Sequence, residues 1–124
     1  MIHLDTNYLI RALVAKSDQA VQLDSWILAG ETIGTSAMAW SEFLCGPLSP
    51  AQTSSALVVL SAVESVTSND AALAADLFNK SGRRRGSLAD CIIAAVAMRA
   101  NASLATANRA DFMPLANLGL TLVP

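Results

Sequence analysis

The chain has 124 residues and a formal net charge of −2; 53% of its residues are hydrophobic and only 15% are charged. This length predicts one domain, residues 1–124, with a real hydrophobic core, and the negative charge excludes nucleic-acid binding driven by charge over the whole surface. No apolar stretch is long enough to span a membrane and no export signal stands at the start, so we expect a cytoplasmic protein.

Short apolar stretches alternate with helical patterns along the first half of the chain. Predicted strands are Met1–Leu4 and Glu31–Thr35, and predicted helices are Thr6 to about Lys16, Ser17 or Asp18 to Gly30, and Ser36–Cys45. Ser17 or Asp18 is a typical helix cap, whereas Gly30 and the Gly46-Pro47 pair are typical helix ends.

The same alternation continues in the second half. Predicted helices are Ser49 to about Ser65, Asn69 or Asp70 to about Lys80, and Ser87–Arg99, and predicted strands are Val66-Thr67, Ala102–Ala105 and Leu120–Val123. A basic loop occupies residues 81–86, and the stretch NRADFMP at 108–114 is rich in turn-forming residues. Strands that alternate with helices favour a parallel sheet covered by helices, an α/β sandwich.

Asp90 is the only polar residue between Leu88 and Met98 in the stretch SLADCIIAAVAM. A helix this apolar is expected to be buried on most sides, and an ionised carboxylate there is costly unless a charge or a hydrogen bond meets it. A structural role stays open, because Ser87 and Asp90 have the spacing of a capping box and an acid in the first turn suits the helix dipole.

Three further acids stand in similar places. Asp5 follows the first strand directly, Glu42 interrupts the apolar pattern of SAMAWSEFLCG, and Asp111 lies in TANRADF after a predicted strand. Each also has a structural interpretation: Asp5 as a helix cap, Glu42 as a solvated side chain, and Asp111, like Asn108, as a turn residue.

The carboxyl ends of parallel strands lie at one edge of a sheet, and ligands bind there. We therefore expect one crevice to collect four carboxylates, those of Asp5, Glu42, Asp90 and Asp111. Such a cluster repels itself, so it takes up protons or recruits a cation. Oxygen ligands are the ones that Mg²⁺ and Mn²⁺ prefer.

Other metals are not indicated. His3 is the only histidine, and we interpret it as an ordinary strand residue, so no zinc-binding set is predicted. The two cysteines, Cys45 and Cys91, lie in apolar helical patterns and are expected to be free, buried thiols.

Four segments, in order, carry a resemblance to a known family: LDTN at 4–7, SEF at 41–43, LADCIIAAVA at 88–97 and TANRADF at 106–112. Over essentially its whole length the chain resembles the PIN-domain nucleases, in particular the VapC-type toxins of bacterial toxin–antitoxin pairs. The resemblance implies a PIN-like three-layer α/β/α sandwich with a short, mainly parallel central sheet. It also implies metal-dependent endoribonuclease activity with Mg²⁺ or Mn²⁺, a homodimer, and a cognate antitoxin that lays a helix over an apolar groove.

By resemblance, the metal-binding and catalytic acids are Asp5, Glu42, Asp90 and Asp111. Asp5 and Asp90 are the best direct ligands, and some family members place the fourth acid where Asn108 stands, so that position is left open. Supporting roles near the metal or its water fall to Thr6, Asn7 and Thr106.

The segment GRRRGS before Asp90 departs from the family, whose members often have a Pro-rich polar segment here. Arg83, Arg84 and Arg85 either hold the RNA backbone, because arginine pairs well with phosphate oxygens, or form a mobile, solvated charge run.

Two other functions remain in competition. One is a Mg²⁺-dependent phosphatase or phosphotransferase with Asp5 as nucleophile, although the strand-end motif Asp-Thr-Asn lacks a second acid two residues on. The other is a catalytically degenerate PIN-like binding module. The apolar composition predicts a partner surface in every case, with Trp26, Trp40 and Phe43 as possible anchors or core residues.

Overall fold

Four short parallel strands form the centre of the computed structural model, which describes residues 1–124. Their spatial order is β3-β2-β1-β4, and their bounds are β1 (Ile2–Leu4), β2 (Ile33–Ser36), β3 (Ala62–Glu64) and β4 (Ser103–Ala105). Because β1 pairs in parallel with both β2 and β4, and β2 pairs in parallel with β3, all carboxyl ends meet at one edge. The expected short parallel sheet is confirmed.

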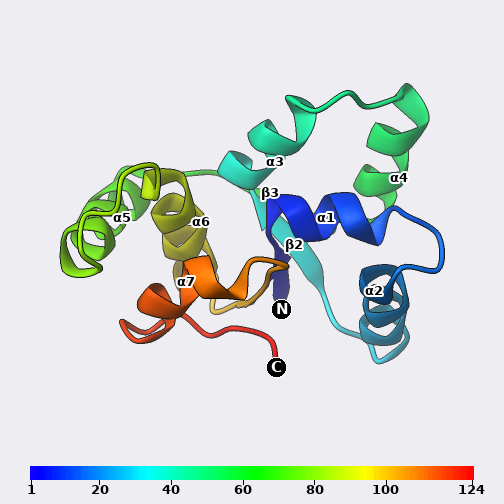
Figure 1. Ribbon diagram of the computed structural model, residues 1–124. Helices are drawn as coiled ribbons and strands as arrows, with labels where there is room; N and C mark the ends of the chain where they lie inside the picture. The colour runs from blue at the N-terminus through cyan, green and yellow to red at the C-terminus, as the bar shows by residue number, and fades with distance from the viewer.

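Seven helices surround this sheet: α1 (Thr6–Ala12), α2 (Asp18–Leu28), α3 (Ala37–Leu44), α4 (Pro50–Val59), α5 (Ser68–Lys80), α6 (Leu88–Arg99) and α7 (Arg109–Ala116). Figure 1 shows α5, α6 and α7 on one side of the sheet and α1, α2 and α4 on the other. The α/β/α layering predicted from the sequence is therefore confirmed. None of the helices combines the length and the apolar character that crossing a bilayer requires.

Each side of the sheet has its own hydrophobic core. The first is built around α6, in which Cys91 and the run Ile93–Ala97 are all buried, and it includes Leu77, Leu104 and Phe112. The second core packs α1, α2 and α4 against the strands, and its buried members include Leu4, Leu9, Leu23, Ile33 and Phe43. Because α6 is buried along its length, the acid in its first turn is held at a fixed place relative to the sheet.

The boundaries of α4 and β3 differ from the prediction. The helix ends at Val59 and not near Ser65, and the strand is Ala62–Glu64 and not Val66-Thr67. Leu60 is buried and extended, and the backbone N–H of Ser61 donates to the carbonyl of Ile33 at 2.8 Å. Pairing with β2 therefore overrides the helical preference of these residues.

The C-terminal part also differs from the prediction, with a helix in place of turns and a bridge in place of a strand. The stretch predicted as turns forms α7, although Pro114 lies inside it, because Phe112 and Leu115 anchor one helical face in the core. The strand predicted at Leu120–Val123 is reduced to an isolated bridge between Leu104 and Leu122.

Several local predictions also need correction. The first helix ends at Ala12, before Lys16, whose φ is +66°. Thr67 caps α5 in a capping box with Asp70, in place of Asn69 or Asp70 as the cap. Cys91 is a buried free thiol as expected, whereas Cys45 is free but exposed.

Candidate active site

Asp5 lies where β1 ends and α1 begins, and its carboxylate is buried with 5% exposure. One oxygen accepts a hydrogen bond from the backbone N–H of Thr6 at 2.7 Å, and the other accepts one from the hydroxyl of Thr106 at 2.8 Å. Thr106 follows β4, the neighbour of β1 in the sheet. Asp5 is therefore the cap of α1 and, in addition, is tied to the adjacent strand end.

Glu42 approaches the same place from α3. The hydroxyl of Thr6 lies 2.9 Å from Oε1 of Glu42 and 3.3 Å from the carbonyl oxygen of Ala39, so the start of α1 is joined to α3. Phe43, the residue after Glu42, is fully buried in the core, whereas Glu42 itself is exposed. The packing of α3 thus leaves its carboxylate free at the edge of the sheet.

Asp90 stands in the first turn of α6, and its side chain is 27% exposed. The capping box expected between Ser87 and Asp90 is absent, because Ser87 makes no side-chain cap bond and its hydroxyl donates to the carbonyl of Arg84 at 2.7 Å. The structural interpretation of Asp90 as a cap partner is therefore wrong, and its carboxylate faces its acidic neighbours.

The four carboxylates influence one another electrostatically. Burial raises the pKa of Asp90 to about 6, with further upward contributions from Asp5, Asp111 and Glu42 that Arg84 only partly offsets. Burial also raises the pKa of Asp5; the hydrogen bonds from Thr106 and Thr6 oppose this, and Glu42 and Asp111 add to it. Acids from four separate segments therefore gather within electrostatic reach of one another.

Asp111 faces the cluster from α7, together with an arginine of the basic loop. Nη1 of Arg84 lies 3.3 Å from Oδ1 of Asp111, and its Nη2 donates to the Asp111 backbone carbonyl at 3.3 Å. The same Nη2 lies 4.0 Å from Oδ2 of Asp90. The contact between Arg84 and these acids was not predicted from the sequence, although an arginine run six residues before a buried acid was the available signal.

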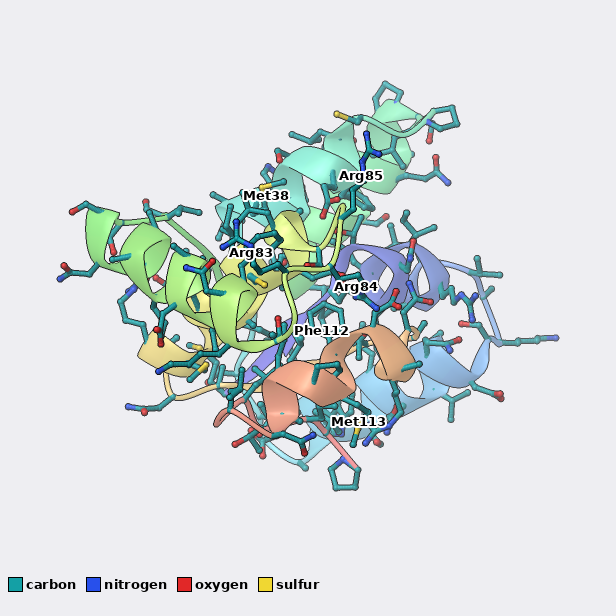
Figure 2. The ribbon with its side chains drawn as sticks, turned by 60° about the vertical axis from the view of Figure 1, so that its left-hand side comes forward. Met38, Arg83, Arg84, Arg85, Phe112 and Met113 are labelled. Atoms are coloured by element: carbon teal, nitrogen blue, oxygen red, sulfur yellow. The ribbon has the colours of Figure 1, made fainter.

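The other two arginines make different contacts, and Figure 2 shows the three side chains leaving the loop in different directions. Arg83 bonds to the side chain of Asn79 and lies over the ring of Phe78, 5.5 Å from its centroid. Arg85 is exposed and forms no ion pair.

The remaining supporting residues divide into two groups. Thr6 and Thr106 touch the acids directly, as described, and the backbone N–H of Asn108 donates to Oγ1 of Thr106 at 3.0 Å. Asn7 is exposed on α1 and makes no side-chain hydrogen bond. The backbone of Asn108 therefore supports Thr106, which holds Asp5, whereas the side chain of Asp111 contributes a carboxylate to the cluster.

The chemistry of this cluster fits a hard divalent cation. All four acids offer only oxygen atoms as metal ligands. The carboxylates of Asp5 and Asp90 have raised pKa values, and added positive charge relieves the repulsion between the acids. No three of the acids stand close enough together to form a closed metal site as the side chains are placed. Both oxygens of Asp5 are held by hydrogen bonds, so Asp5 is the most firmly placed of the four acids.

Comparison with known proteins gives a family and a set of structural neighbours. The PIN domain family model matches residues 2–114, and no curated protein is a significant match. FitAcB from Neisseria gonorrhoeae is 21% identical with a TM-score of 0.75, covering 100% of this chain and 97% of its own. A toxin–antitoxin complex from Klebsiella pneumoniae is 24% identical, with a TM-score of 0.73 and 91% of each chain covered. VapC20 of Mycobacterium tuberculosis, described as a toxin that cleaves the sarcin–ricin loop, is 17% identical, with a TM-score of 0.66 and coverage of 99% and 98%.

Proposed function

The chain belongs to the PIN domain family, and on that premise we propose that it is a metal-dependent endoribonuclease, the toxin of a toxin–antitoxin pair. The observation that carries this proposal is the gathering of Asp5, Glu42, Asp90 and Asp111 at one edge of the sheet, where burial and the neighbouring acids raise the pKa values of Asp5 and Asp90. Such a site attracts an added cation, and a bound metal ion also assists hydrolysis of a phosphodiester.

Asp5 and Asp90 are the proposed direct ligands, because Asp5 is buried directly after β1 and Asp90 stands in the first turn of α6, just before its buried run. Thr6 and Thr106 hold Asp5, and Thr6 also orients Glu42. Glu42 and Asp111 bind the ion directly or through water, or position the attacking water. When bound, Mg²⁺ or Mn²⁺ would supply the positive charge that polarises a phosphoryl oxygen and lowers the pKa of a water, so that the water loses a proton and can attack phosphorus.

RNA is the proposed substrate. VapC20, which shares this fold, is described as a toxin that cleaves the sarcin–ricin loop, and Arg85 offers an exposed cation in the basic loop for phosphate oxygens. Acting on RNA, the protein would work in the cytoplasm. The chain's net negative charge means that RNA binding depends on this local basic loop and on the bound ion.

An antitoxin and a second copy of the chain are the proposed protein partners. The Klebsiella pneumoniae neighbour is a toxin–antitoxin complex, and the helices on one side of the sheet expose large apolar side chains that suit a protein partner. They are Ile10, Val21, Leu28, Leu57 and Val58, and Val14 of the segment between α1 and α2 is exposed beside them in sequence. Co-purification with the neighbouring gene product and light scattering of the free chain test these two partners.

The decisive experiment is cleavage of RNA by the purified protein. We expect cleavage in Mg²⁺ or Mn²⁺, none with a chelator, and none with Asp90→Asn, whose unchanged circular dichroism would show that it is folded. Full activity of Asp90→Asn would overturn the mechanism. Binding of Mn²⁺ without any turnover would favour the degenerate binding module.

The phosphatase alternative has its own test at Asp5. Both oxygens of this buried carboxylate accept hydrogen bonds, which suits a fixed ligand better than a nucleophile that must approach phosphorus. Trapping a phosphorylated Asp5 would nevertheless establish that alternative.

A further inference from the structure

Arg84 is the one cation in the structure that contacts members of the acidic cluster. Its guanidinium lies 3.3 Å from the Asp111 carboxylate and 4.0 Å from that of Asp90. The other two arginines of the loop contact neither acid, since Arg83 is engaged by Asn79 and Phe78 and Arg85 has no partner. Of the three consecutive arginines, only Arg84 therefore contacts the acidic cluster.

The backbone of the loop holds Arg84 in this place. Both the N–H and the hydroxyl of the buried Ser87 donate to the Arg84 carbonyl, at 3.1 and 2.7 Å. Gly82, Arg83 and Gly86 have φ values of +97°, +54° and +81°, a conformation that glycine adopts at little cost. Left-handed turns on both sides thus fold the short loop back over the first turn of α6, so that Arg84 faces the cluster.

We propose that Arg84 is a resident counter-cation of the cluster, a positioning residue that a divalent ion must displace from Asp90 and Asp111. This inference rests on the proposed metal site. A guanidinium and a divalent ion need the same carboxylate oxygens, so binding of one opposes binding of the other. Arg84 thereby sets the concentration of divalent ion at which the site fills.

The size of the effect follows from exposure. The Arg84 side chain and that of Asp111 are each 49% exposed, so the ion pair is screened by solvent. We therefore expect Arg84→Gln to bind Mn²⁺ with a Kd about two to five times smaller than that of the wild type. Arg84→Lys keeps the charge but loses the planar guanidinium, so its Kd for Mn²⁺ should lie between those of Arg84→Gln and the wild type.

The test is an Mn²⁺ titration of each protein, followed by the paramagnetic resonance signal of the free ion, at about 0.15 M salt, where distant charges are screened. Arg85→Gln is the matched control, because it removes the same charge from the same loop without removing a contact to the acids. A Kd that falls for Arg84→Gln and not for Arg85→Gln supports the inference. Equal Kd values for the two variants, or weaker binding by Arg84→Gln, would overturn it.

The same titration separates this inference from the proposed function. If Asp90→Asn loses Mn²⁺ binding while Arg84→Gln and Arg85→Gln remain equal, the metal site stands and only the role of Arg84 fails. If Asp90→Asn binds Mn²⁺ as the wild type does, or if neither the wild type nor Arg84→Gln binds it, the metal site fails and the role of Arg84 fails with it. Thermal unfolding of every variant confirms that the compared proteins are folded.

Discussion

Asp70 and Asp5 are both buried aspartates at helix starts, yet their surroundings are opposite. Asp70 is 1% exposed, accepts hydrogen bonds from Nε of Arg99 at 2.8 and 3.0 Å, and accepts another from the N–H of Thr67. Burial raises the pKa of Asp70, but the bonds from Arg99 and Thr67 outweigh it and the net shift is downward. At Asp5 burial is not outweighed, and the pKa rises.

The difference separates a structural carboxylate, Asp70, from one for which a metal-binding role is proposed, Asp5. At Asp70 the chain provides its own cation, so the charge is neutralised and the fold gains a link between α5 and the end of α6. In the Asp5 cluster a single half-exposed arginine, Arg84, contacts two of the four carboxylates, those of Asp90 and Asp111. The deficit of positive charge there reduces stability and leaves room for a cation from solution.

Asp90→Asn is expected to have the largest effect. It removes a proposed direct metal ligand, so RNA cleavage should fall by more than about 100-fold. The melting temperature should stay equal or rise, because the amide removes one of the repelling charges. A loss of activity accompanied by a clear loss of stability would make Asp90 resemble Asp70 and break the comparison.

Asp70→Ala should have the reverse profile. Losing the bonds to Arg99 and the capping box is expected to lower the free energy of unfolding by about 2 kcal/mol, measured by urea denaturation. Cleavage by the remaining folded protein should be unchanged. Asp76→Ala is the matched control on the same helix, because its exposed pair with Lys80 is worth at most about 0.5 kcal/mol.

The pH dependence of stability should distinguish the two regions. Asp90 has a folded-state pKa of about 6, above its unfolded value, so it stabilises the fold at acidic pH and this contribution is lost as pH rises from about 4 to 6. Asp70 has a lowered pKa, so its contribution is present above about pH 4 and is lost only below it.

Subtracting one protein from another isolates the Asp90 contribution. The free energy of unfolding of Asp90→Asn minus that of the wild type should grow by about 1–2 kcal/mol between pH 4 and 7, allowing for partial solvent screening. A difference that stays flat over this range would show that neither burial nor the neighbouring acids raise the pKa of Asp90 in the folded protein.

His3 sharpens the comparison with a buried group that has no partner at all. It is 1% exposed, and neither ring nitrogen has a hydrogen bond. Burial lowers its pKa, so the unfolded chain takes up a proton first and stability falls as pH drops below about 6.5. His3→Leu should remove that dependence and raise the unfolding free energy by about 1 kcal/mol at neutral pH. Denaturation at pH 5 and 7 measures both effects.

The alternation of strands and helices could be predicted because it follows from local patterns. Met1–Leu4 is a short apolar stretch that ends at Asp5, and every residue of Leu88–Met98 except Asp90 is apolar. The predicted boundaries were wrong where contacts between distant segments determine the secondary structure. Ser61, just before β3, is bound to β2 by a hydrogen bond to the carbonyl of Ile33, and Pro114 is tolerated in α7 because Phe112 and Leu115 are buried.

The site shows the same division. Asp5 and Asp90 could be identified from the sequence because a carboxylate in an apolar segment is costly at any position. The engagement of Arg84 with Asp111 could not, because 27 residues separate them and loop conformation decides which of three arginines points inward. The interpretation of Asp5 as a cap alone was too narrow, since one carboxylate oxygen accepts the N–H of Thr6 and the other accepts the hydroxyl of Thr106.

The pairing of β1 with β4 has a consequence for the synthesis of this protein. The ribosome makes Asp5 near the start, but the strand beside it, Ser103–Ala105, and the hydroxyl of Thr106 that steadies it come more than ninety positions later. A nascent chain therefore carries the first acid without the neighbour that fixes it until β4 and Thr106 have been made. On the proposed function, the nuclease site would be completed only after this later segment emerges, which gives a partner made alongside it time to arrive.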